Sequence, residues 1–199
     1  MKPILLGGAL AALVILSGCT TPPPQRSLVH EIAGGGDYAG IRAEYLPPEV
    51  LRLRYPGRVN PFIAVPMVVT PVEFLVFSAE ISNRLPTGQI HLDRIELTIG
   101  GDTYNPSTPS RMRGYWDNMD TLDQLDAVQR TQFYRRIDME MINRTNRPID
   151  GTASGLLVFR GRSFPVAGTG RLTIPVQDTA TGRVHREEVT FEFQEVRRQ

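Results

Sequence analysis

The chain has 199 residues and a formal net charge of +1 at neutral pH. Lys2 is its single lysine, so the 22 basic residues comprise 21 arginines, and these are balanced by 21 acidic residues. This balance excludes the basic excess typical of nucleic-acid-binding proteins, and no nucleic-acid partner is expected. The single cysteine excludes a disulfide within the chain, so the domain must be stabilised by its hydrophobic core.

The N-terminus carries an apolar run over residues 4–16, directly after a short positive start. Its length of about 13 residues fits the core of a signal peptide and falls short of the roughly 20 residues that span a bilayer. Two small residues follow, and then Cys19. Residues 1–18 are therefore predicted to be a signal peptide.

The order Leu, Ser, Gly, Cys at residues 16–19 resembles the bacterial lipobox, the motif that lipoprotein-processing enzymes read. The resemblance implies that Cys19 becomes the diacylglyceryl-modified, N-acylated first residue of a mature lipoprotein. Two or more acyl chains give a stable membrane anchor, because each buried methylene contributes ~0.8 kcal/mol. Thr20 stands where Asp would imply inner-membrane retention, which favours the outer membrane, with the protein facing the periplasm. An ordinary secretory peptide with a chance cysteine is the alternative.

Residues 19–27 include three consecutive prolines and few apolar side chains. Proline-rich segments form extended spacers of ~3.1 Å per residue, so this segment is predicted to be a tether. Residues 28–199 then form one domain.

Short apolar runs bounded by proline and glycine predict that this domain is built mainly of strands. The clearest strand covers residues 73–83, where every second residue is apolar and faces the core, namely Leu75, Phe77, Ala79 and Ile81. Gly100 and Gly101 are predicted to form a two-residue hairpin turn, and the glycines at 34–36 a flexible loop. The other expected strands are residues 28–32, 41–46, 50–55, 90–99, 103–105, 155–159, 163–166, 171–176 and 188–196.

One helix is expected, within an excursion over about residues 110–143. Thr121 and Gln124 have the spacing of a capping box. Apolar residues follow at helical spacing, namely Leu122, Leu125, Phe133 and Ile137. The helix is predicted to lie on the surface of the strand-built domain.

These elements predict a mainly β fold, an antiparallel immunoglobulin-like β-sandwich with one inserted α-helix. The pattern over residues 72–196 resembles secreted and lipid-anchored bacterial immunoglobulin-like (telokin-like) domains, many of which have no assigned activity. The residues that carry the resemblance are Phe77, Ile81, Asn83, Ile95, Leu97, Tyr104, Pro106 and the run 155–159. The helical excursion departs from that pattern.

No catalytic residue, metal or cofactor is expected. His30, His91 and His185 are far apart in sequence and lack a neighbouring ligand at the spacing of a zinc site, so they are interpreted as surface or strand residues. Four aspartates recur at every third position without the central glycine and closing Glu of a calcium loop, and are interpreted as helix-capping and solvated residues: Asp117, Asp120, Asp123 and Asp126.

Ser154 stands between glycines, which superficially suggests the nucleophile elbow of a hydrolase. An elbow needs glycine two positions away on both sides of the serine, between a strand and a helix. Here the spacing differs and a strand is expected to follow.

A candidate partner surface lies directly before the expected helix, in residue types enriched at binding hot spots: Arg111, Arg113, Tyr115 and Trp116. The alternative is that they fasten the helix onto the sandwich, with Trp116 as a buried peg.

The favoured function is therefore a non-enzymatic, outer-membrane-anchored module that binds another envelope protein. A second hypothesis is a lipoprotein that binds a small molecule or glycan in a cleft lined by Tyr115, Trp116 and Phe133. A third, an envelope hydrolase, requires Ser154 to lie beside a histidine and an acid.

Overall fold

The computed structural model describes residues 25–28, 31–65, 71–143 and 148–196. The predicted signal peptide, Cys19, the prolines that follow it and His30 lie outside these ranges.

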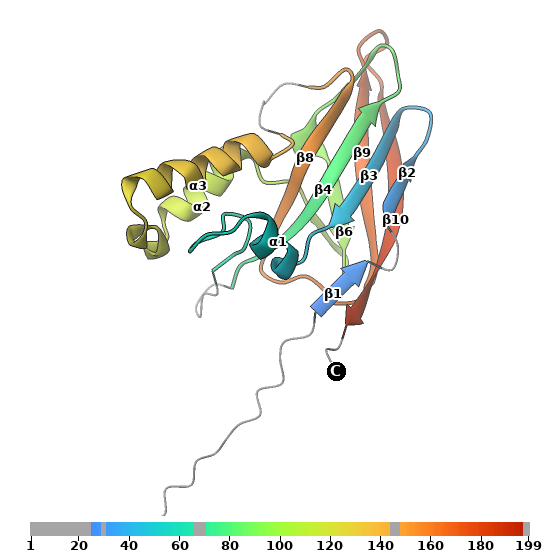
Figure 1. Cartoon of the computed structure of the whole chain (residues 1–199). Coiled ribbons are helices and arrows are strands. Elements are labelled where there is room, and N and C mark those ends of the chain that lie inside the picture. Colours follow the sequence, from blue (N-terminus) through green and yellow to red (C-terminus); the bar gives the residue numbers. More distant parts are fainter. Residues whose placement is uncertain (1–24, 29–30, 66–70, 144–147, 197–199) are drawn as a thin grey trace, which may run out of the picture.

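Two antiparallel sheets pack face to face, as Figure 1 shows. The first contains, in spatial order, β1 (Gln25–Leu28), β10 (Val184–Val196), β9 (Gly168–Asp178), β6 (Glu96–Ile99) and β7 (Asp102–Tyr104), and β5 (Gly88–Ile90) also pairs with β9. The second contains β2 (Ile32–Gly35), β3 (Ala39–Tyr45), β4 (Glu73–Asn83) and β8 (Thr152–Gly161). The predicted antiparallel β-sandwich is confirmed.

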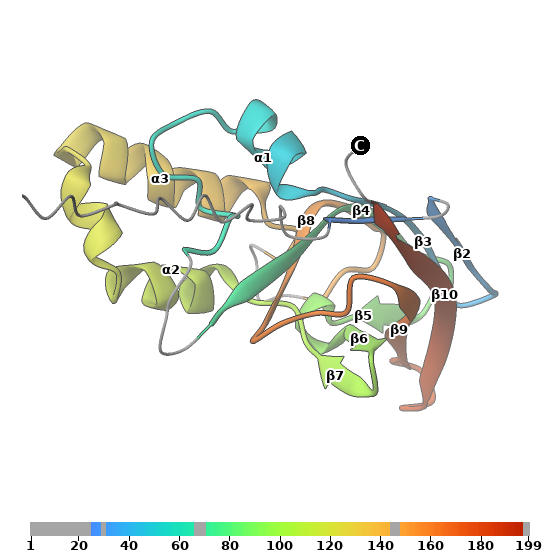
Figure 2. The same cartoon turned by 90° about the horizontal axis from the view of Figure 1, so that it is seen from below.

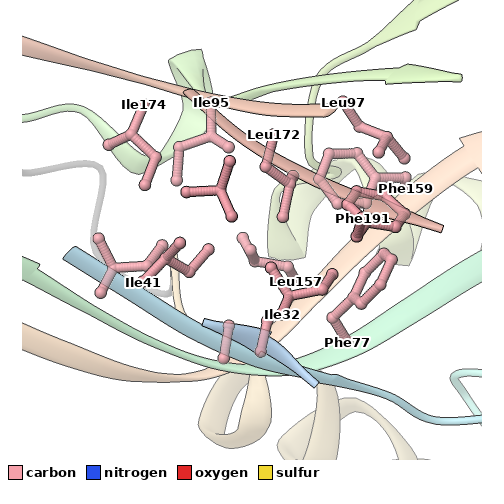
Figure 3. Close-up of a cluster of buried hydrophobic side chains, with 14 of the residues drawn as sticks. Ile32, Ile41, Phe77, Ile95, Leu97, Leu157, Phe159, Leu172, Ile174 and Phe191 are labelled. Carbon is pink, nitrogen blue, oxygen red and sulfur yellow. The ribbon is translucent and has the colours of Figure 1, made fainter. Parts of the chain in front are cut away.

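The interior of the sandwich is filled by the alternate residues of facing strands. Phe77 in β4 is fully buried, and its ring lies near those of Phe159, Phe191 and Phe193. Leu172 and Ile174 approach from β9 on the opposite sheet, as Figure 3 shows. All four alternate residues that the sequence predicts as the core face of β4 are buried in this cluster.

A second hydrophobic cluster covers the outer face of the β2-β3-β4-β8 sheet. Phe74 and Val76 in β4, and Leu156 and Val158 in β8, point away from the sandwich interior and are also buried. They are covered by three helices, α1 (Pro48–Arg54), α2 (Pro109–Asp117) and α3 (Ala127–Glu140). Figure 2 shows these helices gathered on one side of the molecule, next to β4 and β8. The protein therefore has three layers.

The inserted helix begins later than its sequence predicts. Residues 120–124 form a 3-10 turn, and α3 begins at Ala127. The capping box consists of Asp126 and Gln129, because Asp126 accepts from the Gln129 amide at 2.8 Å and the Gln129 side chain accepts from the Asp126 amide at 3.1 Å. The box predicted at Thr121 and Gln124 is wrong. The same spacing recurs five residues later, where a longer helical run follows.

Two further helices lie where the sequence predicts a strand and an irregular segment. The predicted strand at residues 50–55 instead forms the end of α1 and its C-terminal cap Tyr55, where Leu51 and Tyr55 are buried four residues apart, as on one face of a helix. Pro109 occupies the first turn of α2, where the missing N–H costs nothing, and Thr108 caps it by accepting from the Arg111 amide. Pro48 and Pro109 therefore mark the starts of α1 and α2, and neither ends a regular element.

Other boundaries shift as well. The predicted tether is too long at its end, because Gln25 to Ser27 belong to β1 and pair with β10. The predicted glycine loop is partly strand β2, in which a Cβ at Gly34 would lie 3.1 Å from the side chain of Val189. A 3-10 turn interrupts the strand predicted at 90–99, and residues 163–166 form no strand. The hairpin turn at Gly100 and Gly101 is confirmed, with φ of 62° and 89°.

Candidate interaction surface

The four residues of the candidate partner surface lie on α2, but on different faces of it. Tyr115 and Trp116 are buried against the sheet, whereas Arg111 and Arg113 are exposed. A helix turns about 100° per residue, so adjacent positions cannot all face one partner. The structure therefore places two of the four predicted residues in the interior and two on the surface.

Trp116 is a core residue with no exposed surface. Its indole Nε1 donates a hydrogen bond to the carbonyl of Pro61 at 3.0 Å. Its ring meets Phe133 of α3 edge-on, with centroids 5.1 Å apart. The alternative interpretation of Trp116 as a buried peg is correct.

Tyr115 packs beside it against the sheet. Its ring meets that of Phe74 in β4 edge-on at 5.0 Å, and the Arg160 guanidinium lies 5.9 Å from the ring centroid. Its hydroxyl accepts a hydrogen bond from the Val65 amide at 3.3 Å, and burial raises the pKa of Tyr115. Tyr115 therefore holds the connection between α1 and β4 and is not exposed for contact with a partner protein.

Arg113 joins α2 to α3. Its Nε donates to Asp138 Oδ1 at 3.1 Å, and its guanidinium lies 5.7 Å from the ring centroid of Tyr134. Tyr134 in turn donates to Asp117, and burial together with that bond raises the pKa of Tyr134 to about 12. These contacts hold α2 and α3 side by side as a hairpin.

The α2–α3 hairpin extends sideways from the sandwich, on the side away from β10, as Figure 1 shows. Its exposed surface is mostly polar, but two large apolar side chains of α3 are also exposed. Val128 is 66 % exposed near the start of α3, and Met139 is 55 % exposed near its end. Sequence reasoning missed both residues, because they lie off the apolar stripe that identified the helix.

Arg111 lies at the rim of an open hollow of about 660 Å³ on the other side of α2. The lining combines cations and anions and includes Asp93, Arg94, Glu96, Asn105, Thr108, Pro175, Val184 and Arg186. This mixture of charges selects for neither an anion nor a cation.

The apolar ligand cleft expected between helix and sandwich is filled by side chains. Trp116 and Phe133 pack edge to face there, and Tyr115 closes the space towards β4. The hollow beside Phe133 measures about 180 Å³, below the 300–1,000 Å³ usual for ligand pockets. The geometry therefore provides no cleft lined by these three residues.

Another hollow, of about 430 Å³, lies next to β1, between α1 and β4. Arg26 of β1 lines it and is almost fully buried. Arg26 forms an ion pair with Glu73 and donates from Nη2 to the carbonyl of Phe164 at 2.7 Å. The arginine thus fastens the first strand to β4 and to the connection after β8.

The residues weighed for catalysis are dispersed. Ser154 is the third residue of β8, paired with Glu80 of β4, and does not lie at a turn between a strand and a helix. The hollow beside it is lined by neither His91 nor His185. His185 stacks on Tyr38, with ring centroids 3.9 Å apart. Within residues 25–28, 31–65, 71–143 and 148–196, no cluster of three His, Cys, Asp or Glu side chains is arranged to hold a metal ion.

None of the helices in the described part of the chain is long and apolar enough to cross a membrane. No protein-family model, curated protein or solved structure matches this chain.

Proposed function

We propose that this protein is an outer-membrane-anchored periplasmic lipoprotein whose α2–α3 hairpin binds another protein of the cell envelope, without catalysing a reaction. The anchor is Cys19, at the end of the lipobox-like order of residues. The observation that carries the binding role is that the hairpin adds a separate layer with its own hydrophobic cluster to a sandwich that already has a complete interior.

The hairpin has the properties that a protein partner requires. Its two helices are fixed to each other by the Arg113–Asp138 ion pair and the Tyr134–Asp117 bond, so little conformational entropy is lost on binding. Its exposed surface combines the apolar side chains of Val128 and Met139 with polar neighbours, as in a typical interface.

The anchor is tested with Cys19→Ser. We expect the wild-type protein to remain with outer-membrane vesicles after high-salt washing, because acyl chains and not charges hold it. The serine variant lacks both the acylated sulfur and the residue that the processing enzymes read, so it is expected to be lost from the outer-membrane fraction, as measured by immunoblotting of fractionated cells. A serine variant that stays in the outer-membrane fraction contradicts the anchor.

The binding surface is tested with the double substitution Val128→Asp and Met139→Asp. Both side chains are exposed, so the fold is retained, whereas a carboxylate in the centre of an interface remains unpaired and costs several kcal/mol. We expect the proteins crosslinked to the wild type in intact envelopes to be lost from the variant, as measured by quantitative mass spectrometry of the crosslinked species.

The matched control is Val184→Asp, at an exposed valine that lies on β10 and not on α3, which carries both substituted positions. Its crosslinked species should equal those of the wild type. If the double variant keeps every crosslinked species, the hairpin is not the binding surface.

A further inference from the structure

Helix α1 and the start of the folded chain lie at the same end of the sandwich. Gln25, the first residue of β1, donates a side-chain hydrogen bond to Glu49 of α1. Gln25 also pairs with Val196, the last residue of β10. Figure 1 shows α1 beside β1 at the end where β1 begins and β10 ends.

This end cannot move far from the proposed lipid anchor. Gln25 follows Cys19 by six residues. A fully extended chain spans at most about 3.6 Å per residue, so the start of β1 lies within about 22 Å of the backbone of Cys19. Side chains exposed on α1 are therefore kept close to the surface of the bilayer at a high effective concentration.

The face of α1 that points away from the protein is unusually apolar. Leu51 and Tyr55 face inward and are buried, whereas Leu53 is 83 % exposed and Val50 is also exposed. Val50 and Leu53 are three residues apart and share one side of the helix. Leu53 is the most exposed of the large apolar side chains in the described part of the chain.

Three exposed arginines accompany these apolar side chains in α1 and in the segment directly after it. Arg52, Arg54 and Arg58 are all exposed, and none of them forms an ion pair with another described residue. The guanidinium of Arg54 lies 5.5 Å from the ring centroid of Tyr55, and it shares a shallow hollow with Glu44 and Glu140. Arg52 and Arg58 do not line that hollow, and Arg52 lines the 430 Å³ hollow that also includes Glu49 and Glu73.

We propose that α1 docks on the anionic phospholipid surface of the bilayer that holds the protein. The docking surface consists of Val50, Arg52, Leu53, Arg54 and Arg58. Leucine and valine enter the boundary between headgroups and acyl chains, and the guanidinium groups contact lipid phosphates. This inference rests on the proposed acylation of Cys19, which keeps α1 near the membrane.

Docking fixes the orientation of the protein. With the α1 end against the bilayer, the β9–β10 hairpin end is held away from it, because β10 runs thirteen residues from Val184 to Val196. A strand of that length spans about 40 Å. The α2–α3 hairpin then extends along the membrane, where it meets partners held in the same bilayer.

The experiment places an environment-sensitive NBD fluorophore on Leu53→Cys in the full-length lipidated protein. Acylation consumes the thiol of Cys19, so the introduced thiol is the one that reacts. In vesicles that contain phosphatidylglycerol, we expect a blue shift and a several-fold rise in NBD emission. In phosphatidylcholine vesicles the rise should be smaller, because the cations lose their anionic partner.

The matched control carries NBD on Val184→Cys, which is also exposed but lies at the far end of β10. Its emission should stay at the wavelength of the aqueous probe in both kinds of vesicle. If both probes shift, or if the Leu53 probe remains aqueous while the protein floats with the vesicles, the proposed docking surface is wrong.

A failure of the anchor gives a different result. The parent protein without an introduced cysteine would then react with the fluorophore at Cys19 and would not float with the vesicles.

The arginines are tested in the protein labelled at position 53, by the substitutions Arg52→Ser and Arg58→Ser. Each change should lower the ratio of docked to undocked protein about fivefold in phosphatidylglycerol vesicles.

Discussion

Trp116→Ala is expected to lower the free energy of unfolding by about 3–5 kcal/mol, the usual cost of removing a large buried aromatic side chain. The indole is fully buried and supplies the ring against which Phe133 packs. Its loss leaves a cavity between α2, α3 and the sheet, and it leaves the Pro61 carbonyl without its donor. Urea denaturation followed by circular dichroism measures the change, and the melting temperature should fall by about 10 °C.

Trp116→Phe separates the two contributions. Phenylalanine keeps an aromatic ring in the cluster but has no N–H for Pro61, so we expect a smaller loss of about 1–3 kcal/mol. Gly114→Ala is the matched control in α2, since a Cβ at that position would have no neighbour within 4 Å. Alanine there should be neutral or stabilise by about 0.5–1 kcal/mol. Wild-type stability in Trp116→Ala would contradict the core role of the indole.

Gly155→Ala is expected to cost about 3 kcal/mol, because strain and a backbone collision act together. Gly155 has a φ of +152°, which disfavours side chains. A Cβ there would lie 2.7 Å from the carbonyl oxygen of Glu140 and 2.9 Å from the amide nitrogen of Ile142. These are backbone atoms at the end of α3, where Ile142 donates to the Leu156 carbonyl at 3.0 Å, so they cannot turn aside as a side chain would.

The effect should be concentrated at the joint between the helical layer and β8. In Gly155→Ala, the backbone amides in the last turn of α3 are expected to lose protection from hydrogen exchange before those of β4 do. Gly168→Ala is the matched control, because Gly168 has a similar φ of +125° but a Cβ there would have no neighbour within 4 Å. Its cost should be about 1 kcal/mol from strain alone. Equal losses in the two variants would mean that the contact with α3 is not tight.

The strand architecture follows from sequence patterns that depend on burial of one face. The sequence predicts β4 with its observed bounds, because its alternate residues are apolar over four successive positions of the core face. β10 likewise alternates Val189, Phe191 and Phe193 with charged or polar residues. Where one face of a strand is exposed to solvent, as in β10 and in β4 after Val76, period-two alternation is sufficient to identify it.

The helical layer is harder to predict, because its segments are short. α1 has seven residues, and over that length leucine and arginine alternate as in a half-buried strand. The inward positions, Leu51 and Tyr55, form a single i, i+4 pair, which is too little to establish a helical period. This ambiguity conceals the proposed α1 docking surface, because in a strand Leu53 would share the buried face with Leu51.

The candidate partner surface is divided for a related reason. Composition identifies residue types that favour binding, but the same types fill cores. Met112, Tyr115 and Trp116 have the i, i+3, i+4 spacing of a buried helical stripe, and this signal separates them from exposed Arg111 and Arg113. Pro109 lies in the first turn of α2. In the sequence it suggests an irregular segment, so the helical spacing that follows it is easily missed.

The pairing of the first strand with the last has a practical consequence for labelling. Because Gln25 lies opposite Val196, both ends of the folded domain leave it at the same place. With the proposed acyl chains on Cys19, an epitope or fluorescent reporter appended to the C-terminus would be carried to the bilayer and would crowd α1. The turn at Thr181 and Gly182, at the opposite end of β10, is the better insertion point for an antibody tag.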